Sequence, residues 1–252
     1  MRRLLILGGT GEAAELARAV AAAFGDRIEL VSSLAGRTRA PAPLPGKVRS
    51  GGFGGAEGLA RYLRDERIDL LVDATHPYAA RMSANARTAC EAAGVPRLTL
   101  LRPPWEKQAG DNWIAVPDAR EAARRLPEFG SRAFVTLGSG DLSAFAGIRD
   151  IAILLRVAEQ PARPPLPGAE IIVGRGPFAA DAEHRLLARR RIDVVVSRNS
   201  GGRSTVGKIT AARRLALPVI MLNRPAPEPG ARTWNVEETV KWIAENPAWP
   251  AP

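Results

Sequence analysis

The chain has 252 residues, enough for one large domain or two smaller ones. Its composition, 46% hydrophobic and 25% charged, excludes a disordered chain, a collagen-like fibre and a coiled coil. The formal net charge is +10, and Lys occurs at only four positions, so 32 of the 36 basic residues are Arg. A strongly basic chain suggests an anionic partner, which leaves a nucleic acid, an anionic membrane or a small molecule with several acidic groups. A nucleotide bias of the source genome is an equally good explanation of the many arginines.

Cysteine usage and hydropathy indicate the compartment. Cys90 is the single cysteine and cannot form an internal disulfide, and its Ala-rich surroundings predict a packed thiol. No stretch approaches the roughly 18 apolar residues of a membrane span, and the apolar run at residues 4–7 is too short for a signal peptide. We expect a cytoplasmic protein.

Short apolar strands alternate with helical patterns over the first hundred residues. The predicted strands are 4–7, 28–32, 47–50, 70–74 and 97–101, and the predicted helices are 12–24, 57–67 and 79–93. Continuous apolar strands between helices indicate a parallel sheet that is covered on both faces. Right-handed crossovers make such a sheet a doubly wound, Rossmann-like domain.

Residues 102–112, rich in proline and polar residues, interrupt this pattern and are interpreted as a linker. Asp118 then provides an N-cap for a helix. The further predicted helices are 119–126, 180–190, 204–215 and 237–245, and the strands are 133–137, 151–157, 171–173, 194–197 and 219–222. The sequence therefore predicts an α/β protein of two Rossmann-like, doubly wound domains with mainly parallel sheets and an interdomain cleft. We expect the domains to span residues 1–105 and 106–252.

Ligands of such sheets bind outside the carboxyl ends of the strands, so chemistry is expected there. The first strand ends in Gly8-Gly9-Thr10-Gly11-Glu12, a glycine turn that opens a helix and suits a phosphate. The spacing is neither GxGxxG nor that of a P-loop. A plain tight turn is the alternative.

The second predicted strand ends without an acid. NAD-binding folds usually place Asp or Glu there to bind the ribose 2′-OH, whereas this chain has Ser32, Ser33 and then Arg37. Two hydroxyls and a guanidinium suit a 2′-phosphate, which a carboxylate would repel. The residues favour NADPH, and a polar loop with a solvated arginine is the alternative.

The next two strand ends carry a glycine loop and a polar cluster. Gly51-Gly52-Phe53-Gly54-Gly55 permits close approach of the backbone to a ligand. Asp73-Ala74-Thr75-His76-Pro77-Tyr78 holds a histidine able to donate a proton near neutral pH. An explanation of His76 as a hydrogen-bonded turn residue is at least as good. Asp73 is explained either as a cap of the next helix or as a residue that ties down the loop.

In the second half, glycines and arginines stand together at several strand ends and predict an anion-binding cleft. Lys208 lies in a predicted helix, either as a salt-bridge partner or as a carboxylate ligand. Several enzyme classes are disfavoured because the Tyr-x-x-x-Lys, GxSxG and HExxH patterns are absent. No metal site is expected.

A series of motifs resembles the precorrin-6A reductase family of cobalamin biosynthesis. In order they are Gly8-Gly9-Thr10-x-Glu12-Ala13, Ser32-x-x-Ala35-Gly36-Arg37, Gly51-Gly52-Phe53-Gly54-Gly55, Asp73-Ala74-Thr75-His76-Pro77-Tyr78-Ala79, Arg102-Pro103-x-Trp105, Gly174-Arg175-Gly176-Pro177-Phe178 and Asn199-Ser200-Gly201-Gly202. One departure is Arg198, where a lysine is expected. The resemblance implies an NADPH-dependent reductase that transfers hydride to one double bond of precorrin-6A, giving precorrin-6B.

The resemblance, with the strand ends, gives each candidate residue a role. His76 and Tyr78 are candidate proton donors, with water as a third. The cofactor-binding residues are expected to be Gly8, Gly9, Thr10, Gly11, Glu12, Ser32, Ser33, Arg37, Gly52, Phe53 and Thr75. The carboxylates of the macrocycle are expected to meet Arg102, Arg156, Arg175, Arg198, Asn199, Ser200, Gly201 and Lys208.

Two other functions stay open at this point. Glycine turns after a first strand also serve S-adenosylmethionine, so a methyltransferase of the same pathway is the alternative enzyme. The charge alone suggests a nucleic-acid-binding protein, although both halves carry the same net charge of +5 and neither has a basic tail. We expect neither a nucleic acid nor a membrane as partner, and a monomer or small homo-oligomer.

Overall fold

The computed structural model describes residues 1–36 and 43–246, which form two compact units. The first unit contains residues 1–103 and the segment that begins at Pro225, and the second contains residues 104–224. Each unit is built on one six-stranded sheet in which every paired neighbour is parallel. The predicted α/β class is confirmed.

The sheet of the first unit has the order β3-β2-β1-β4-β5-β12. Its strands are β1 (Arg2–Leu7), β2 (Ile28–Leu34), β3 (Lys47–Ser50), β4 (Leu70–Asp73), β5 (Arg97–Leu100) and β12 (Arg232–Thr233). Numbered along the chain within the unit, this is the 3-2-1-4-5-6 order of a Rossmann domain. The carboxyl ends of β1, β2, β3 and β4 therefore lie along one edge, where a ligand is expected.

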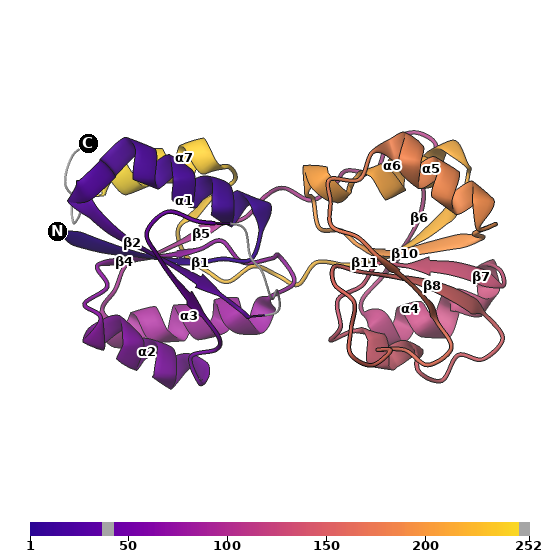
Figure 1. The fold of residues 1–252 in the computed structure, drawn as a ribbon, viewed down its shortest axis with the longest axis horizontal. Helices are drawn as coiled ribbons and strands as arrows, with labels where there is room; N and C mark the ends of the chain where they lie inside the picture. Colours follow the sequence, from indigo (N-terminus) through magenta and orange to yellow (C-terminus); the bar gives the residue numbers. More distant parts are fainter. Residues whose placement is uncertain (37–42, 247–252) are drawn as a thin grey trace. The chain divides into compact units, whose positions relative to one another are not determined.

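Helices cover both faces of this sheet (Figure 1). On one face lie α1 (Gly11–Phe24) and α7 (Val236–Glu245), and on the other lie α2 (Gly55–Asp65) and α3 (Ala80–Ala93). Leu4 and Ile6 pack into the core under α1, whereas Leu5 and Leu7 pack into the core under α2 and α3. Because both faces of the sheet are buried, residues 4–7 of β1 are all apolar and do not alternate with polar residues.

The sheet of the second unit has the order β9-β8-β7-β10-β11-β6. From β7 to β11 it follows the 3-2-1-4-5 pattern, but its sixth place is taken by β6, which comes first in the chain of this unit. Its strands are β6 (Asn112–Val116), β7 (Arg132–Val135), β8 (Ala152–Val157), β9 (Glu170–Val173), β10 (Val194–Arg198) and β11 (Pro218–Leu222). Its helices are α4 (Ala119–Arg125) on one face, and α5 (Ala180–Arg189) and α6 (Gly207–Arg214) on the other (Figure 1). Asp118 caps α4, as predicted, by accepting hydrogen bonds from the N–H groups of Arg120 and Glu121.

The division of the chain differs from the expected 1–105 and 106–252. The last described segment belongs to the first unit, because β12 pairs with β5 and Ile243 of α7 is fully buried in the core beneath α1. Residues 112–116, taken as the end of a linker and its flank, form β6, which pairs with β11. The segment predicted as a helix over 204–215 begins as a 3-10 turn at Arg203–Thr205, and α6 starts only at Gly207.

The single cysteine and the helix lengths agree with the sequence analysis. Cys90 is buried, and burial raises the pKa of its thiol to about 12, so it is the packed, unreactive thiol that was predicted. Short 3-10 turns complete the fold at Gly25–Arg27, Leu126–Phe129 and Leu142–Phe145. Over residues 1–36 and 43–246, every helix falls short of the length and apolarity needed to cross a bilayer.

Candidate functional site

The glycine turn after β1 is held open by hydrogen bonds to its neighbours. The Gly8 N–H donates to the Ser33 carbonyl at 2.9 Å, so this turn lies against the end of β2. Thr10 caps α1 by accepting from the Ala13 N–H at 3.0 Å, and its hydroxyl donates to the Ala74 carbonyl at 2.9 Å. Gly9 adopts φ +105°, a conformation that favours glycine. The result is a fixed turn before a helix N-terminus, which suits a phosphate.

Two predicted ligands of different kinds pair with each other beside this turn. Arg102 Nη1 lies 2.5 Å from Glu12 Oε2, and both residues belong to the first unit. Arg102 therefore stands next to the expected cofactor turn, with its charge shared with Glu12. Its predicted contact with a substrate carboxylate stays a prediction.

The two serines at the end of β2 have different environments. Ser32 is 2% exposed, and its hydroxyl is a buried polar atom with no hydrogen-bond partner among the described residues. Ser33 accepts a hydrogen bond from Arg49 at 2.7 Å. Arg37, the expected phosphate ligand, lies outside the described residues. Ser33 is thus the better placed of the two serines to face a ligand at this edge.

Arg49 is a functional candidate that the sequence analysis missed. It lies near the end of β3, directly opposite Ser33 in the strand register. Its guanidinium lies 3.8 Å from the centre of the Phe53 ring and also donates to the carbonyls of Gly51 and Gly52, each at 3.2 Å. Its signal in the sequence is an arginine just before a glycine loop, and it lies inside a strand, whereas ligands were expected only after the strand ends.

The polar cluster after β4 is organised by a buried acid. Asp73 is 1% exposed, and its Oδ1 accepts hydrogen bonds from the Thr75 N–H at 3.1 Å and hydroxyl at 2.7 Å. His76 Nδ1 accepts from the Tyr78 N–H at 3.2 Å, which leaves Nε2 to carry the proton of the neutral ring. The rings of His76 and Tyr78 lie 5.7 Å apart. Asp73 therefore ties down the loop, as one of the two interpretations held, and the candidate proton donors share one turn.

The arginines predicted to bind substrate carboxylates in the second unit already contact carboxylates of the protein. Arg198 pairs with Asp141 at 2.5 Å, Arg175 pairs with Glu159, and Arg156 pairs with Glu183 through both terminal nitrogens at 2.7 and 2.8 Å. An incoming carboxylate must compete with these acids or share their arginines. Their predicted role in substrate binding stays untested by these contacts.

The pair formed by Arg156 and Glu183 is the most buried of these. Glu183 is 3% exposed, and the Arg156 guanidinium lies 4.9 Å from the Phe134 ring centre and 4.0 Å from that of Phe178. Lys208 is buried nearby, where its ammonium donates to the Thr205 carbonyl at 3.0 Å. These side chains form a buried charge cluster in the second unit, in which the printed hydrogen bond of Lys208 goes to a backbone carbonyl. Both interpretations of Lys208, salt-bridge partner and carboxylate ligand, stay predictions.

Lys208 is expected to make stability depend on pH. Burial lowers the pKa of its ammonium to about 8 in the folded chain, below the ordinary value of 10.5. Between these two values the unfolded chain binds more protons, so stability rises with pH. Between pH 8 and 9.5 the wild type should gain about 1.5 kcal/mol over Lys208→Met in urea unfolding. Parallel pH profiles of the two proteins would contradict this assignment.

Asn199 serves as a clamp on a neighbouring segment. Its side-chain oxygen accepts from the Trp105 N–H at 2.7 Å, and its side-chain nitrogen donates to the Trp105 carbonyl at 3.0 Å. The Asn199 carbonyl also accepts from Arg224 at 2.7 Å. Ser200 is buried, and Gly201 adopts φ +72°. These three predicted substrate residues thus form a fixed turn after β10.

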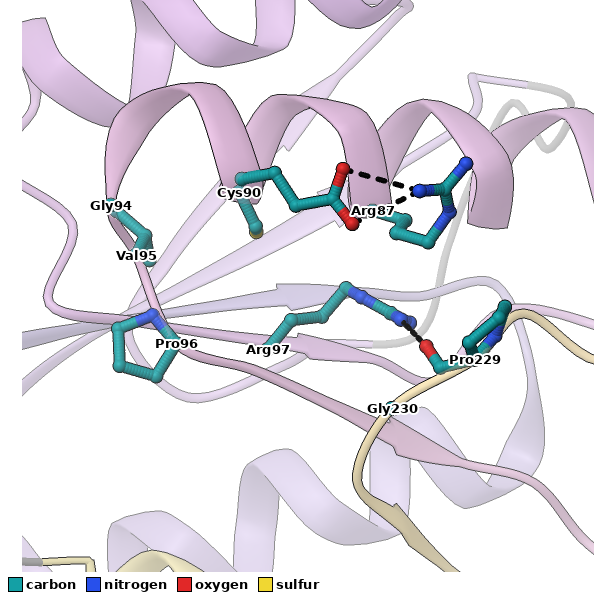
Figure 2. A pocket seen from close by; sticks show the side chains of 9 residues that line it. Arg87, Cys90, Gly94, Val95, Pro96, Arg97, Pro229 and Gly230 are labelled. Carbon is teal, nitrogen blue, oxygen red and sulfur yellow. Dashed lines mark hydrogen bonds and ion pairs between the residues drawn. The ribbon is translucent and has the colours of Figure 1, made fainter.

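A pocket of the first unit lies away from all of these residues (Figure 2). It is lined by the last turns of α3, the start of β5 and the segment of Pro229 and Gly230. Arg87 pairs with Glu91 at 3.0 Å, and Arg97 donates to the Pro229 carbonyl. Because β5 begins here, the pocket lies at the amino ends of the parallel strands, opposite the glycine turn.

A parallel sheet in Rossmann order, with a glycine turn at the carboxyl end of β1, is typical of α/β proteins that bind nucleotides. A family model described as precorrin-6x reductase CbiJ/CobK matches residues 3–244. The chain belongs to this family. It is therefore an oxidoreductase, and its Rossmann-like fold suggests a nicotinamide cofactor.

Individual relatives agree with the family model. A precorrin-6A reductase of Rhodococcus erythropolis is 44% identical over 96% of this chain and 98% of its own length. A cobalt-precorrin-6A reductase of Salmonella typhimurium is 32% identical over 89% of this chain and 88% of its own. The solved structure of CobK precorrin-6A reductase matches with a TM-score of 0.92 and 43% identity, and covers 99% of both chains. The resemblance inferred from the motifs is confirmed, and the methyltransferase alternative finds no support.

Proposed function

We propose that this protein uses NADPH to reduce one double bond of precorrin-6A, giving precorrin-6B in cobalamin biosynthesis. The observation that carries the proposal is the match to the precorrin-6x reductase family over residues 3–244. The identity to the precorrin-6A reductase of Rhodococcus erythropolis exceeds that to the cobalt-precorrin-6A reductase of Salmonella typhimurium, which favours the metal-free macrocycle.

The first unit supports NADPH over NADH through the charge at its sheet edge. Residues 30–56 contain neither Asp nor Glu, so the end of β2 offers no carboxylate of its own for a ribose 2′-OH. The nearest acid along the strand, Glu29, is bound by Arg3 at 2.7 Å and Lys47 at 2.6 Å near the start of β2. Those two hydrogen bonds lower the pKa of Glu29 and keep it an anion that is already neutralised.

The proposed chemistry divides between cofactor and protein. Bound NADPH supplies the hydride, while the protein orients the partners and excludes water. Asp73 fixes Thr75, and the following turn presents His76 and Tyr78, one of which we propose donates the proton, with water as the third candidate. Arg175 and Arg198 of the second unit are proposed to meet carboxylates of the macrocycle.

Titration of the purified protein with NADPH and with NADH, followed by nicotinamide fluorescence, tests the cofactor. We expect NADPH to bind at least about tenfold more tightly, since a charge-assisted contact to the 2′-phosphate contributes about 1.5–3 kcal/mol. Equal, weak binding of both would overturn the 2′-phosphate argument. Binding of S-adenosylmethionine without binding of NADPH would overturn the reductase proposal.

The substrate is tested by NADPH oxidation with each macrocycle. We expect oxidation with metal-free precorrin-6A and slower turnover with the cobalt-bound ring.

We also propose that the protein is cytoplasmic, has no nucleic-acid partner and is a monomer or small homo-oligomer. A salt-sensitive shift of RNA at micromolar protein would contradict the second of these.

A further inference from the structure

We propose that Arg49 recognises the 2′-phosphate of the cofactor and is the main determinant of its choice. The proposal rests on the proposed use of NADPH and names the residue that makes the distinction. It moves that role from Ser32, Ser33 and Arg37, which the sequence singled out, to an arginine one strand further along the sheet.

The strand register places Arg49 at the expected ribose position. In the parallel pairing of β2 with β3, Arg49 lies opposite Ser33. The carbonyl of Ser33 accepts the hydrogen bond from Gly8 of the glycine turn, so turn, serine and arginine form a continuous row. In a Rossmann domain the pyrophosphate lies at the glycine turn and the adenosine ribose lies beside the end of the second strand.

The guanidinium of Arg49 forms no ion pair with a carboxylate of the described residues. Its three hydrogen bonds go to the Ser33 hydroxyl and to the carbonyls of Gly51 and Gly52. A guanidinium has five N–H donors, so Nε and one proton of Nη2 remain without a described partner. By contrast, Arg102, Arg156, Arg175 and Arg198 each pair with a carboxylate. Arg49 therefore combines unneutralised charge with spare donors, as a phosphate ligand requires.

Two aromatic rings hold this guanidinium in place. Its central carbon lies 3.8 Å from the Phe53 ring centre and 5.1 Å from that of Tyr62. Phe53 and Tyr62 contact each other edge to face, with ring centres 5.1 Å apart. A stacked, planar guanidinium loses little further freedom when it binds a phosphate, and lysine does not reproduce this arrangement. Phe53, predicted as a cofactor residue, acts in this proposal by supporting Arg49.

The test compares two fragments that differ only in the 2′-phosphate, 2′,5′-ADP and 5′-AMP. Their affinities are measured by calorimetry with the wild type and with Arg49→Gln. We expect Arg49→Gln to weaken 2′,5′-ADP binding about 10- to 100-fold and to leave 5′-AMP binding within about twofold. Arg49→Lys should fall between, because it keeps the charge and loses the planar fork.

Arg61→Gln is the matched control, because Arg61 is an exposed arginine of α2 and the change in charge is the same. Urea unfolding of each variant shows whether a loss of affinity is only a loss of fold. Equal losses for both fragments in Arg49→Gln would assign Arg49 a structural role and overturn the proposal.

The test separates this proposal from the one on which it rests. If the wild type binds both fragments equally, the NADPH preference itself fails. If the wild type prefers 2′,5′-ADP and Arg49→Gln keeps that preference, the inference about Arg49 alone is overturned. A full loss of preference in Arg37→Gln, with none in Arg49→Gln, would assign the phosphate to Arg37.

Discussion

Replacing Glu183 by glutamine is expected to lower the free energy of unfolding of the second unit by about 3–5 kcal/mol, the usual cost of breaking a buried ion pair from one side. The substitution keeps the shape and removes the charge that faces the Arg156 guanidinium at 2.7 and 2.8 Å. It also removes the carboxylate whose attraction opposes the lowering of the Lys208 pKa by burial. Two buried cations then lack their anion, and urea unfolding measures the loss.

Glu170→Gln is the matched control for this prediction. Glu170 pairs with Arg190 at 2.7 Å, but both side chains are about half exposed, so the loss should stay below about 1 kcal/mol. A similar loss in the two variants would show that Glu183 contributes no more than a surface ion pair.

Replacing Gly58 by alanine is the second substitution that we expect to lower the free energy of unfolding strongly. Helix propensity alone predicts a gain of about 1 kcal/mol in the interior of α2. A Cβ at this position, however, would lie 1.7 Å from the Phe53 carbonyl oxygen, so the helix or the glycine loop must shift. We expect the free energy of unfolding to fall by about 3 kcal/mol, because overpacking at a rigid site has a cost of this order.

The shift should also be visible in cofactor binding, because Phe53 stacks on Arg49. Gly58→Ala should weaken 2′,5′-ADP binding in the same calorimetric experiment. Gly147→Ala serves as the control, since its Cβ would have no neighbour within 4 Å. A more stable Gly58→Ala protein with unchanged affinity would show that helix propensity outweighs the contact.

Most of the fold could be predicted because both faces of each sheet are covered. Burial on both faces makes strands such as β1 and β4 continuous apolar runs between glycine turns and helices. The strand β12 was missed because its two residues carry no periodicity, and its place is decided by pairing with β5. The strand β6 was missed because it follows a proline-rich segment that reads as a linker, although Trp113, Ile114 and Val116 are apolar.

The candidate site could be predicted only where it depends on local sequence. The turn after Asp73 involves residues close in the chain, and Asp73 ties down that loop, as one of its two interpretations expected. The contact of Arg49 with Ser33 depends on the register between two strands, which periodicity does not fix. The pairing of Arg102 with Glu12 joins residues 90 positions apart, so no local motif predicts it.

Because the chain returns to its first sheet, the two units are completed in a fixed order during synthesis. Domains generally fold as units while the chain leaves the ribosome, the N-terminal part first. Here the residues of the second unit are all made before β12 and α7 exist, so the unit that begins first is completed last. Until then β5 has an unpaired edge, and the core under α1 lacks Ile243. An unpaired strand edge and an uncovered apolar core are surfaces that associate readily with other chains. A nascent chain that stops at Arg224 would carry a closed second domain and an unfinished first one.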